Sequence, residues 1–143
     1  MKLALAADHG GFELKERIKI YLDSRKGLEI QDLGTYSTDS TDYPQYGKAC
    51  AEAVASGEAD RGIVFCGTGI GISIAANRIK GIRCALATDP FMAEMSRKHN
   101  DANMLALGGR VLSEEEAAAI VDVWLSTDFE GGRHKRRIDL LDC

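Results

Sequence analysis

The chain has 143 residues, of which 45% are hydrophobic and 28% charged, and its formal net charge is −4 at pH 7. This composition indicates one ordinary globular domain and excludes a disordered chain. The acidic balance argues against nucleic-acid binding, and no apolar stretch approaches the roughly 18 residues that span a bilayer. The short N-terminal apolar run is interrupted at Asp8, so we expect no signal peptide and a cytoplasmic protein. The four cysteines form no CxxC pair, which favours free thiols over a zinc site.

The first half of the chain alternates strand-like and helix-like segments. Short apolar runs are typical of strands, whereas apolar residues recur near helical spacing in the segment that begins at Phe12. Gly34 and Gly57 follow a predicted strand and a predicted helix as stop signals. We expect strands at 2–7 and 28–33, helices at 12–25 and 46–56, and a polar loop at 35–43.

The second half repeats the same alternation. Pro90 suits the first turn of a helix, and the sequence Ser113-Glu114-Glu115-Glu116 resembles a capping box. We expect strands at 62–66, 82–87 and 103–107, helices at 70–79, 90–98 and 113–125, and a short helix within the basic C-terminal tail at about 130–143.

Strands that alternate with helices predict a parallel sheet covered on both faces. The expected fold is α/β: a single domain over residues 1–143, built as a three-layer αβα Rossmann-like sandwich with a five-stranded parallel sheet. Ligands of such sheets bind outside the carboxyl ends of the strands. The residues predicted there are Asp8 and His9, the loop before Tyr43, Cys66 to Gly71, Asp89, and Gly108 to Arg110.

The segment FCGTGIGIS at residues 65–73 is a glycine-rich turn between a predicted strand and a predicted helix. Three common phosphate sites are excluded there by residue identity. A dinucleotide fingerprint needs a third glycine where this loop has Ile72 or Ile74, and a P-loop needs a lysine followed by serine or threonine. A cysteine phosphatase needs an arginine six positions after its nucleophile, but Ile72 stands at that distance from Cys66.

What remains is an anion site beside a thiol. Three glycines let backbone N–H groups point into one concavity at a helix N-terminus, which stabilises a phosphate, a carboxylate or a developing enolate. The same field favours the thiolate form of Cys66, and a thiolate there can abstract a proton next to a carbonyl. Thr68 adds a hydroxyl that can pass a proton between oxygens. From this segment alone, a tight turn with a buried thiol remains the alternative.

Basic side chains supply candidates for binding a phosphate. His9 follows the first strand, within a DHGG segment whose glycines let a ligand approach. His99 is predicted near the end of a helix, where a structural cation is the alternative. Arg133 and Arg137 project from one face if the tail is helical, a pairing that suits a phosphate dianion, and Arg110 can join them. A solvated basic cap is the alternative for the tail.

Six segments together resemble the ribose-5-phosphate isomerase B family, which includes isomerases of galactose 6-phosphate and allose 6-phosphate. Each segment is a weak signal alone, but their order and spacing are specific and cover nearly the whole chain. They are ADHGG at 7–11, TDYP at 41–44, CGTGIGISIAAN at 66–77, GIR at 81–83, SRKHNDANMLALGGR at 96–110 and EGGRHKRR at 130–137.

The resemblance implies interconversion of ribose 5-phosphate and ribulose 5-phosphate, a step of the pentose phosphate pathway, without a metal or an organic cofactor. It also implies a homodimer or a dimer of dimers whose active sites are shared between subunits. An isomerase of a six-carbon sugar phosphate, or a non-catalytic phosphate-binding module on the same fold, remains the alternative.

The resemblance further assigns catalytic roles. Cys66 is the base that moves the proton between C1 and C2, Thr68 assists transfer between the oxygens, and His99 helps to open the furanose ring. Members with a glutamate base carry it at the position of Ile72 and lack the cysteine, so this chain resembles the cysteine branch. Backbone N–H groups of the loop hold the enediolate oxygen; the residues concerned are Gly67, Gly69, Ile70 and Gly71.

The remaining implied residues bind the substrate. Asp8 and Asn100 contact the sugar oxygens, and Tyr43 lines the pocket. In the family, three residues come from the neighbouring subunit: His99, Asn100 and Arg110. The phosphate ligands implied by the resemblance are His9, Arg110, Arg133 and Arg137.

Overall fold

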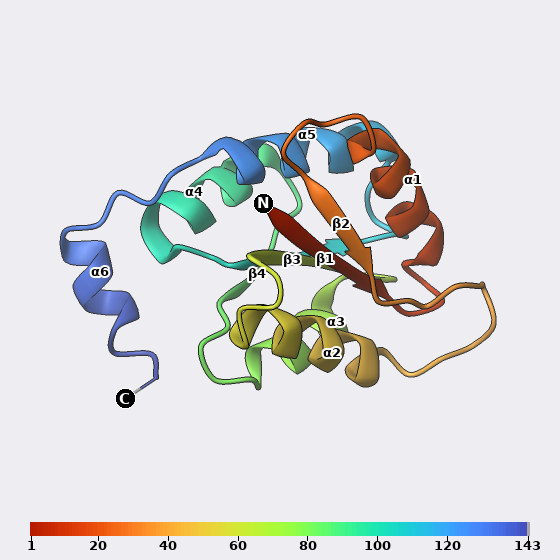
Figure 1. Cartoon of the computed structure of the whole chain (residues 1–143), viewed down its shortest axis with the longest axis horizontal. Helices are drawn as coiled ribbons and strands as arrows, with labels where there is room; N and C mark the ends of the chain where they lie inside the picture. The colour runs from red at the N-terminus through yellow and green to blue at the C-terminus, as the bar shows by residue number, and fades with distance from the viewer. Residues whose placement is uncertain (143) are drawn as a thin grey trace.

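The structure, a computed structural model that describes residues 1–142, alternates strands and helices as the sequence predicts (Figure 1). Cys143, the last residue of the predicted domain, lies outside the described residues. No helix among residues 1–142 is long and apolar enough to cross a membrane. The elements are β1 (Lys2–Ala7), α1 (Phe12–Leu22), β2 (Glu29–Asp32), α2 (Tyr43–Ala55), β3 (Arg61–Cys66), α3 (Ile70–Asn77), β4 (Cys84–Leu86), α4 (Pro90–Asn100), β5 (Met104–Gly108), α5 (Glu114–Ser126) and α6 (Arg133–Ile138).

The five strands form one parallel sheet in the order β2-β1-β3-β5-β4. Helices α1, α4 and α5 cover one face, and α2 and α3 cover the other (Figure 1). These layers confirm the predicted α/β sandwich with a five-stranded parallel sheet. Because all strands run the same way, their carboxyl ends meet at a single edge.

Side-chain alternation along the strands creates two separate cores. On β1, Leu3 and Leu5 pack in the cluster that contains Trp124 of α5, whereas Ala4 and Ala6 pack in the cluster beneath α2 and α3. The second face is lined by smaller side chains, so its helices approach the strands closely: a β-carbon on Gly62 would lie 2.7 Å from the sulfur of Cys50. Both faces of the sheet are therefore buried, as expected for parallel strands.

Element bounds differ from the prediction mainly at the sheet edge and at helix termini. The helix predicted from residue 46 begins at Tyr43, because extended Asp42 leads directly into a first turn that contains Pro44. β4 has only three residues, as it pairs with β5 on one side alone. α1 ends at Leu22 instead of Arg25.

Candidate active site

Close backbone contacts join the ends of β1, β3 and β5, which are neighbours in the sheet. A β-carbon on Gly11 would lie 2.3 Å from the carbonyl carbon of Phe65, and one on Gly108 would lie 2.7 Å from the carbonyl group of Thr68. Only glycine fits at such distances. The turn after β1 and the end of β5 are thereby held against the loop that follows β3.

Cys66 ends β3, and its sulfur lies at the N-terminus of α3. The side chain is almost buried, and its Sγ accepts a hydrogen bond from the backbone N–H of Gly69 at 3.1 Å. Gly69 can place its N–H there because it adopts a left-handed conformation with φ of 82°. Donation from a backbone N–H at a helix N-terminus stabilises negative charge on sulfur.

Two further predicted residues lie in or against the loop, Thr68 within it and Tyr43 of α2 beside it. The hydroxyl oxygen of Thr68 accepts a hydrogen bond from the N–H of Ile70 at 3.2 Å. The ring of Tyr43 lies against Gly71, where a β-carbon would come within 2.9 Å of two ring atoms. The N–H groups of Gly69 and Ile70 thus have partners inside the loop.

The other described cysteines have a different environment. Burial raises the pKa of Cys84 to about 12, and burial raises the pKa of Cys50 as well. Both thiols therefore stay protonated at neutral pH. Of the three described cysteines, Cys66 alone lies at a helix N-terminus.

The turn after β1 orients two predicted ligands. Asp8 is buried, and its Oδ1 accepts the N–H groups of Gly10 at 2.9 Å and Gly11 at 3.1 Å. Nδ1 of His9 accepts the N–H of Thr41 at 3.1 Å, while the N–H of His9 donates to the Thr41 hydroxyl at 3.2 Å. Because Nδ1 is an acceptor, a neutral His9 ring carries its proton on Nε2 and can donate it to an anion.

A cavity of about 280 Å³ lies beside this turn. It brings together a histidine and an arginine, which suits an anionic group. Arg110 also lies against the Cys66 loop, since a β-carbon on Gly67 would be 3.1 Å from its Nη1. The lining residues are His9, Gly10, Glu13, Leu14, Thr38, Gly109 and Arg110.

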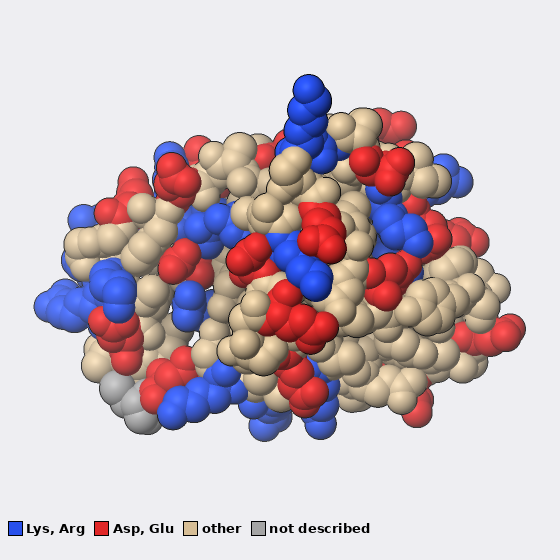
Figure 2. Space-filling view, in the orientation of Figure 1, with Lys and Arg blue, Asp and Glu red and all other residues tan. Residues whose placement is uncertain are grey.

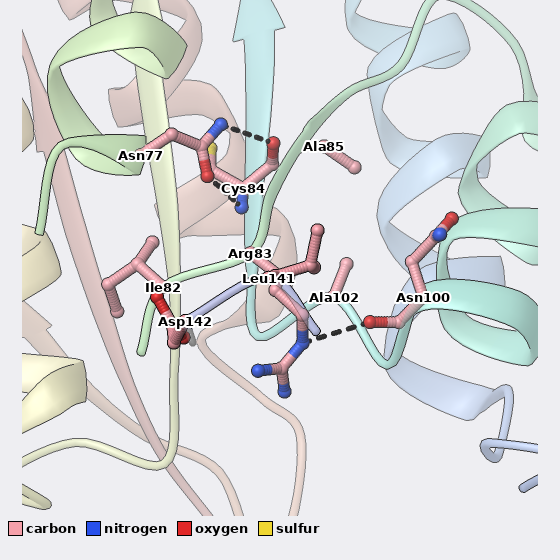
Figure 3. A pocket seen from close by; sticks show the side chains of 9 residues that line it. All are labelled: Asn77, Ile82, Arg83, Cys84, Ala85, Asn100, Ala102, Leu141 and Asp142. Atoms are coloured by element: carbon pink, nitrogen blue, oxygen red, sulfur yellow. Dashed lines mark hydrogen bonds between the residues drawn. The ribbon is translucent and has the colours of Figure 1, made fainter. Parts of the chain in front are cut away.

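The remaining predicted residues lie at the opposite edge of the sheet. α4 starts beyond the carboxyl end of β4 and runs back, so that His99 and Asn100 end it beside the amino end of β4. Nε of Arg83, which precedes β4, donates to the carbonyl oxygen of Asn100 at 2.9 Å (Figure 3). A cavity of about 410 Å³ opens there, lined by Asn77, Ile82, Arg83, Cys84, Ala85, Asn100, Ala102, Leu141 and Asp142.

α6 packs beside α4 at this far edge, and Figure 2 shows basic side chains gathered over it at the left. Arg133 and Arg137 are exposed and form no ion pair with any residue among 1–142. The buried ring of His134 stacks on His99 with centroids 4.3 Å apart. Burial lowers the pKa of His134, the charges of His99 and Arg133 lower it further, and Glu130 acts in the opposite direction.

The predicted residues therefore fall into two groups. β3 crosses the sheet with six residues, and at about 3.3 Å per residue the two edges lie roughly 20 Å apart. The carboxyl-edge group is Asp8, His9, Tyr43, Cys66, Gly67, Thr68, Gly69, Ile70, Gly71 and Arg110. The amino-edge group is His99, Asn100, Arg133 and Arg137.

Comparison with known proteins identifies the family. The sequence matches the family described as Ribose/Galactose Isomerase over residues 3–141. The chain belongs to this family. It is 51% identical to ribose-5-phosphate isomerase B of Escherichia coli over 140 residues, which cover 98% of this chain and 93% of that protein.

Solved structures of relatives have the same fold. The ribose-5-phosphate isomerase B of Clostridium thermocellum is 54% identical and superimposes with a TM-score of 0.97 over 99% of this chain and 95% of that one. The protein from Thermotoga maritima is 55% identical, with a TM-score of 0.96 over 99% and 97% of the two chains. Membership of the family agrees with the resemblance that the six sequence segments indicate.

The geometry corrects one sequence-based expectation and adds three residues. Arg110 was expected from a neighbouring subunit, but it shares a cavity with His9 of its own chain, because β5 ends next to β3 at the carboxyl edge. Sequence reasoning did not single out Thr41, although it lies in the TDYP segment and holds His9. Glu130 and His134, inside the EGGRHKRR segment, were likewise not chosen as partners of His99.

Proposed function

We propose that this protein is an aldose–ketose isomerase that interconverts ribose 5-phosphate and ribulose 5-phosphate. Relatives named ribose-5-phosphate isomerase B support this assignment over nearly the whole chain. The observation that carries it is the Cys66 sulfur, held by the Gly69 N–H at a helix N-terminus and flanked by the turn that bears Asp8 and His9. Proton transfer next to a carbonyl requires a base and donors for the developing oxyanion, and a thiolate beside N–H groups supplies both.

The reaction moves one proton between two carbons. In the aldose-to-ketose direction, the Cys66 thiolate removes the C2 proton, the electrons form the enediolate, and the thiol returns the proton to C1. Thr68 relays a proton between the two oxygens. Backbone donors of the loop other than Gly69 and Ile70, whose N–H groups are bonded to Cys66 and Thr68, stabilise the developing oxyanion, typically by about 3 kcal/mol for each well-placed donor.

The substrate phosphate lies away from the reacting carbons and positions them. His9 and Arg110 line one cavity beside the loop and present donors to a phosphate. Binding energy from this remote group holds C1 and C2 against the sulfur. The phosphate also carries up to about two negative charges, so the substrate does not cross a membrane unaided, which agrees with the predicted cytoplasmic location.

A second copy of the chain completes each site. His99, Asn100, Arg133 and Arg137 end on the edge opposite Cys66, too far away to reach substrate bound in their own chain. A two-fold dimer brings the amino-edge group of one copy to the carboxyl-edge group of the other. Exposed apolar side chains beside the β4 edge supply a surface for such contact; they are Ile70 and Ile74 on α3, and Phe91 and Met92 on α4.

The decisive experiment compares the wild-type protein with Cys66→Ala. We expect kcat/KM for ribose 5-phosphate to fall about 1,000-fold, because no other group of the loop can take up the proton. Binding of a non-reacting sugar phosphate, measured by isothermal titration calorimetry, should change less than about threefold, since the phosphate contacts remain.

Cys50→Ala is the matched control, because it removes a core thiol outside the site. It should keep wild-type turnover at 25 °C. Full turnover by Cys66→Ala would refute the proposed base.

Six-carbon sugar phosphates are the second candidate substrates, because the family description includes galactose. Turnover of galactose 6-phosphate or allose 6-phosphate with a kcat/KM above that of ribose 5-phosphate would favour them. A phosphate-binding module without catalysis would show no turnover of any of the three substrates.

A further inference from the structure

Two histidines and a glutamate meet where α4 contacts the segment that leads into α6. Nε2 of His99 lies 3.7 Å from Oε1 of Glu130, and Nε2 of His134 lies 3.6 Å from the same oxygen. One potential ligand atom from each residue lies within 4.8 Å of the other two. Within one chain, the cluster lies apart from the Cys66 loop, at the amino edge of the sheet.

The His134 imidazole has an unused nitrogen that faces this cluster. Its side chain is 8% exposed, and its Nε2 is buried without a hydrogen-bond partner among the described residues. A buried nitrogen without a partner is destabilising. Glu130 stands near enough for electrostatic attraction but too far for a hydrogen bond.

Two imidazoles and a carboxylate are ligands typical of Zn²⁺. With metal–ligand distances of about 2.0–2.1 Å, tetrahedral ligand atoms lie about 3.4 Å apart, close to the two observed separations. Each imidazole binds a metal in the plane of its ring, so the stacked rings must fan open. His99 and Glu130 are 42% and 51% exposed, which leaves them free to turn toward an ion held by the buried His134.

We propose that His99, Glu130 and His134 form a binding site for a divalent transition-metal ion, with Zn²⁺ preferred, and that occupancy withdraws His99 from the substrate. The bound ion therefore inhibits the isomerisation. The exposed guanidinium groups of Arg133 and Arg137 on α6 oppose a cation, so the site should bind more weakly than a structural zinc site. The inhibitory consequence rests on the proposed function and on the ring-opening role that the family resemblance implies for His99, whereas the binding itself does not.

Binding is tested on the full-length protein by calorimetry with Zn²⁺ alone. We expect one ion per chain at this site, with affinity at least tenfold weaker in Glu130→Gln and in His134→Ala. Glu52→Gln, an exposed glutamate on α2, is the matched control and should bind like the wild type. Because His134 is buried, circular dichroism checks its folding, and the exposed Glu130→Gln carries the test if His134→Ala does not fold.

Thiols compete for zinc, so a second readout identifies the ligands. Co²⁺ substitution should give visible absorption without thiolate-to-cobalt charge transfer, and Cys66→Ser should bind as the wild type does. Absence of binding, unchanged affinity in Glu130→Gln, or loss of binding in Cys66→Ser would each overturn the site.

Inhibition is then measured as a fraction of each variant's own activity. Zn²⁺ should slow ribose 5-phosphate turnover reversibly, with recovery on chelation, and Glu130→Gln should need at least tenfold more ion. Zn²⁺ that binds through this cluster yet leaves turnover unchanged would overturn the inhibitory part. A protein that binds the ion but never isomerises the sugar would instead contradict the proposed function and leave the site standing.

Discussion

Asp32 links α1 to the loop that supports His9. Its carboxylate accepts Nζ of buried Lys15 at 2.7 Å and Nζ of Lys19 at 2.7 Å, and it caps the N–H of Gly34 at 2.9 Å. The same loop continues to Thr41, which fixes the ring of His9. A single carboxylate therefore neutralises a buried ammonium group and anchors the segment that orients His9.

Replacing Asp32 by Asn should lower the free energy of unfolding at pH 7 by about 2 kcal/mol. The buried charge of Lys15 loses its main partner, and the loss stays below the full cost of an unpaired buried charge because Glu16 remains 3.0 Å away. Urea denaturation measures the change. Glu94→Gln, which breaks an exposed ion pair with Lys98, is the control and should cost less than about 0.5 kcal/mol.

The same carboxylate gives a pH dependence. Burial raises the pKa of Asp32, but hydrogen bonds from Lys15, Lys19 and the Gly34 N–H lower it more, so the pKa in the folded protein lies below its ordinary value. The stabilisation is therefore present above the unfolded-state pKa near about 4 and is lost as the pH falls through the folded-state value. Below about pH 4 the wild type should lose stability more steeply than Asp32→Asn, and parallel curves would contradict this.

His99→Asn separates ring opening from proton transfer. We expect kcat/KM for ribose 5-phosphate to fall about 100-fold, since the imidazole no longer moves the proton that opens the furanose. Erythrose 4-phosphate cannot close a furanose ring, because its C4 oxygen is phosphorylated, and its turnover should fall less than about threefold. Equal losses on both aldoses in a coupled assay would count against this role.

At the scale of elements, local signals set where several helices begin. The Ser113 hydroxyl accepts the Glu116 N–H at 3.1 Å and the Glu116 carboxylate accepts the Ser113 N–H at 2.9 Å, which confirms the predicted capping box. The Asp89 carboxylate caps α4 in the same way, by accepting the Met92 N–H at 2.8 Å. The helix predicted from residue 46 starts earlier, at Tyr43, because Pro44 stands in its first turn, where proline is favoured.

Ser113→Ala should lower the free energy of unfolding by about 1 kcal/mol, the usual cost of losing a helix N-cap. The effect should appear as a lower midpoint in urea with an unchanged slope. Ser126→Ala, at the other end of α5, removes a hydroxyl that bonds only within its own helix. It should change stability by less than about 0.5 kcal/mol, and an equal effect of the two variants would contradict the capping argument.

At the scale of the whole molecule, the direction of each element divides the candidate site. β3 ends at Cys66, and β1 and β5 end just before Asp8 and Arg110, so all three residues lie at one edge of the sheet. α4 returns across the sheet and leaves His99 at the other edge, with α6 beside it at the far left of Figure 1. The proposed shared site between two copies rests on this geometry and not on any single residue.

A subunit-mixing experiment tests this arrangement. Hybrid dimers of Cys66→Ala and His99→Asn chains, isolated with two affinity tags, contain one site with both residues intact and one with neither. The hybrid should recover about half of the wild-type turnover of ribose 5-phosphate. A hybrid of His99→Asn with a chain that carries both substitutions has no intact site and should not exceed the residual activity of His99→Asn. Failure of the first hybrid to recover activity would refute the shared site.

The sequence by itself determined the family and the parallel sheet, and it predicted the chemistry at the Cys66 loop. Hydrophobic periodicity, glycines at the ends of elements and capping residues act over a few residues, so they can be recognised in the sequence alone. The dinucleotide fingerprint and the cysteine phosphatase motif are likewise excluded by the identity of single residues, Ile72 and Ile74. The sheet and the family are confirmed, while the roles of the site residues remain predictions.

Only the tertiary structure decided which residues stand together. Arg110 joins His9 because β5 lies next to β3, a pairing that no local pattern encodes. The contact of His134 and Glu130 with His99 likewise arises where the C-terminal segment packs on α4. The alternation of strands and helices along the chain indicates that the strands run parallel. The order of the strands and the packing of the helices are set by burial of apolar faces, which acts between distant residues.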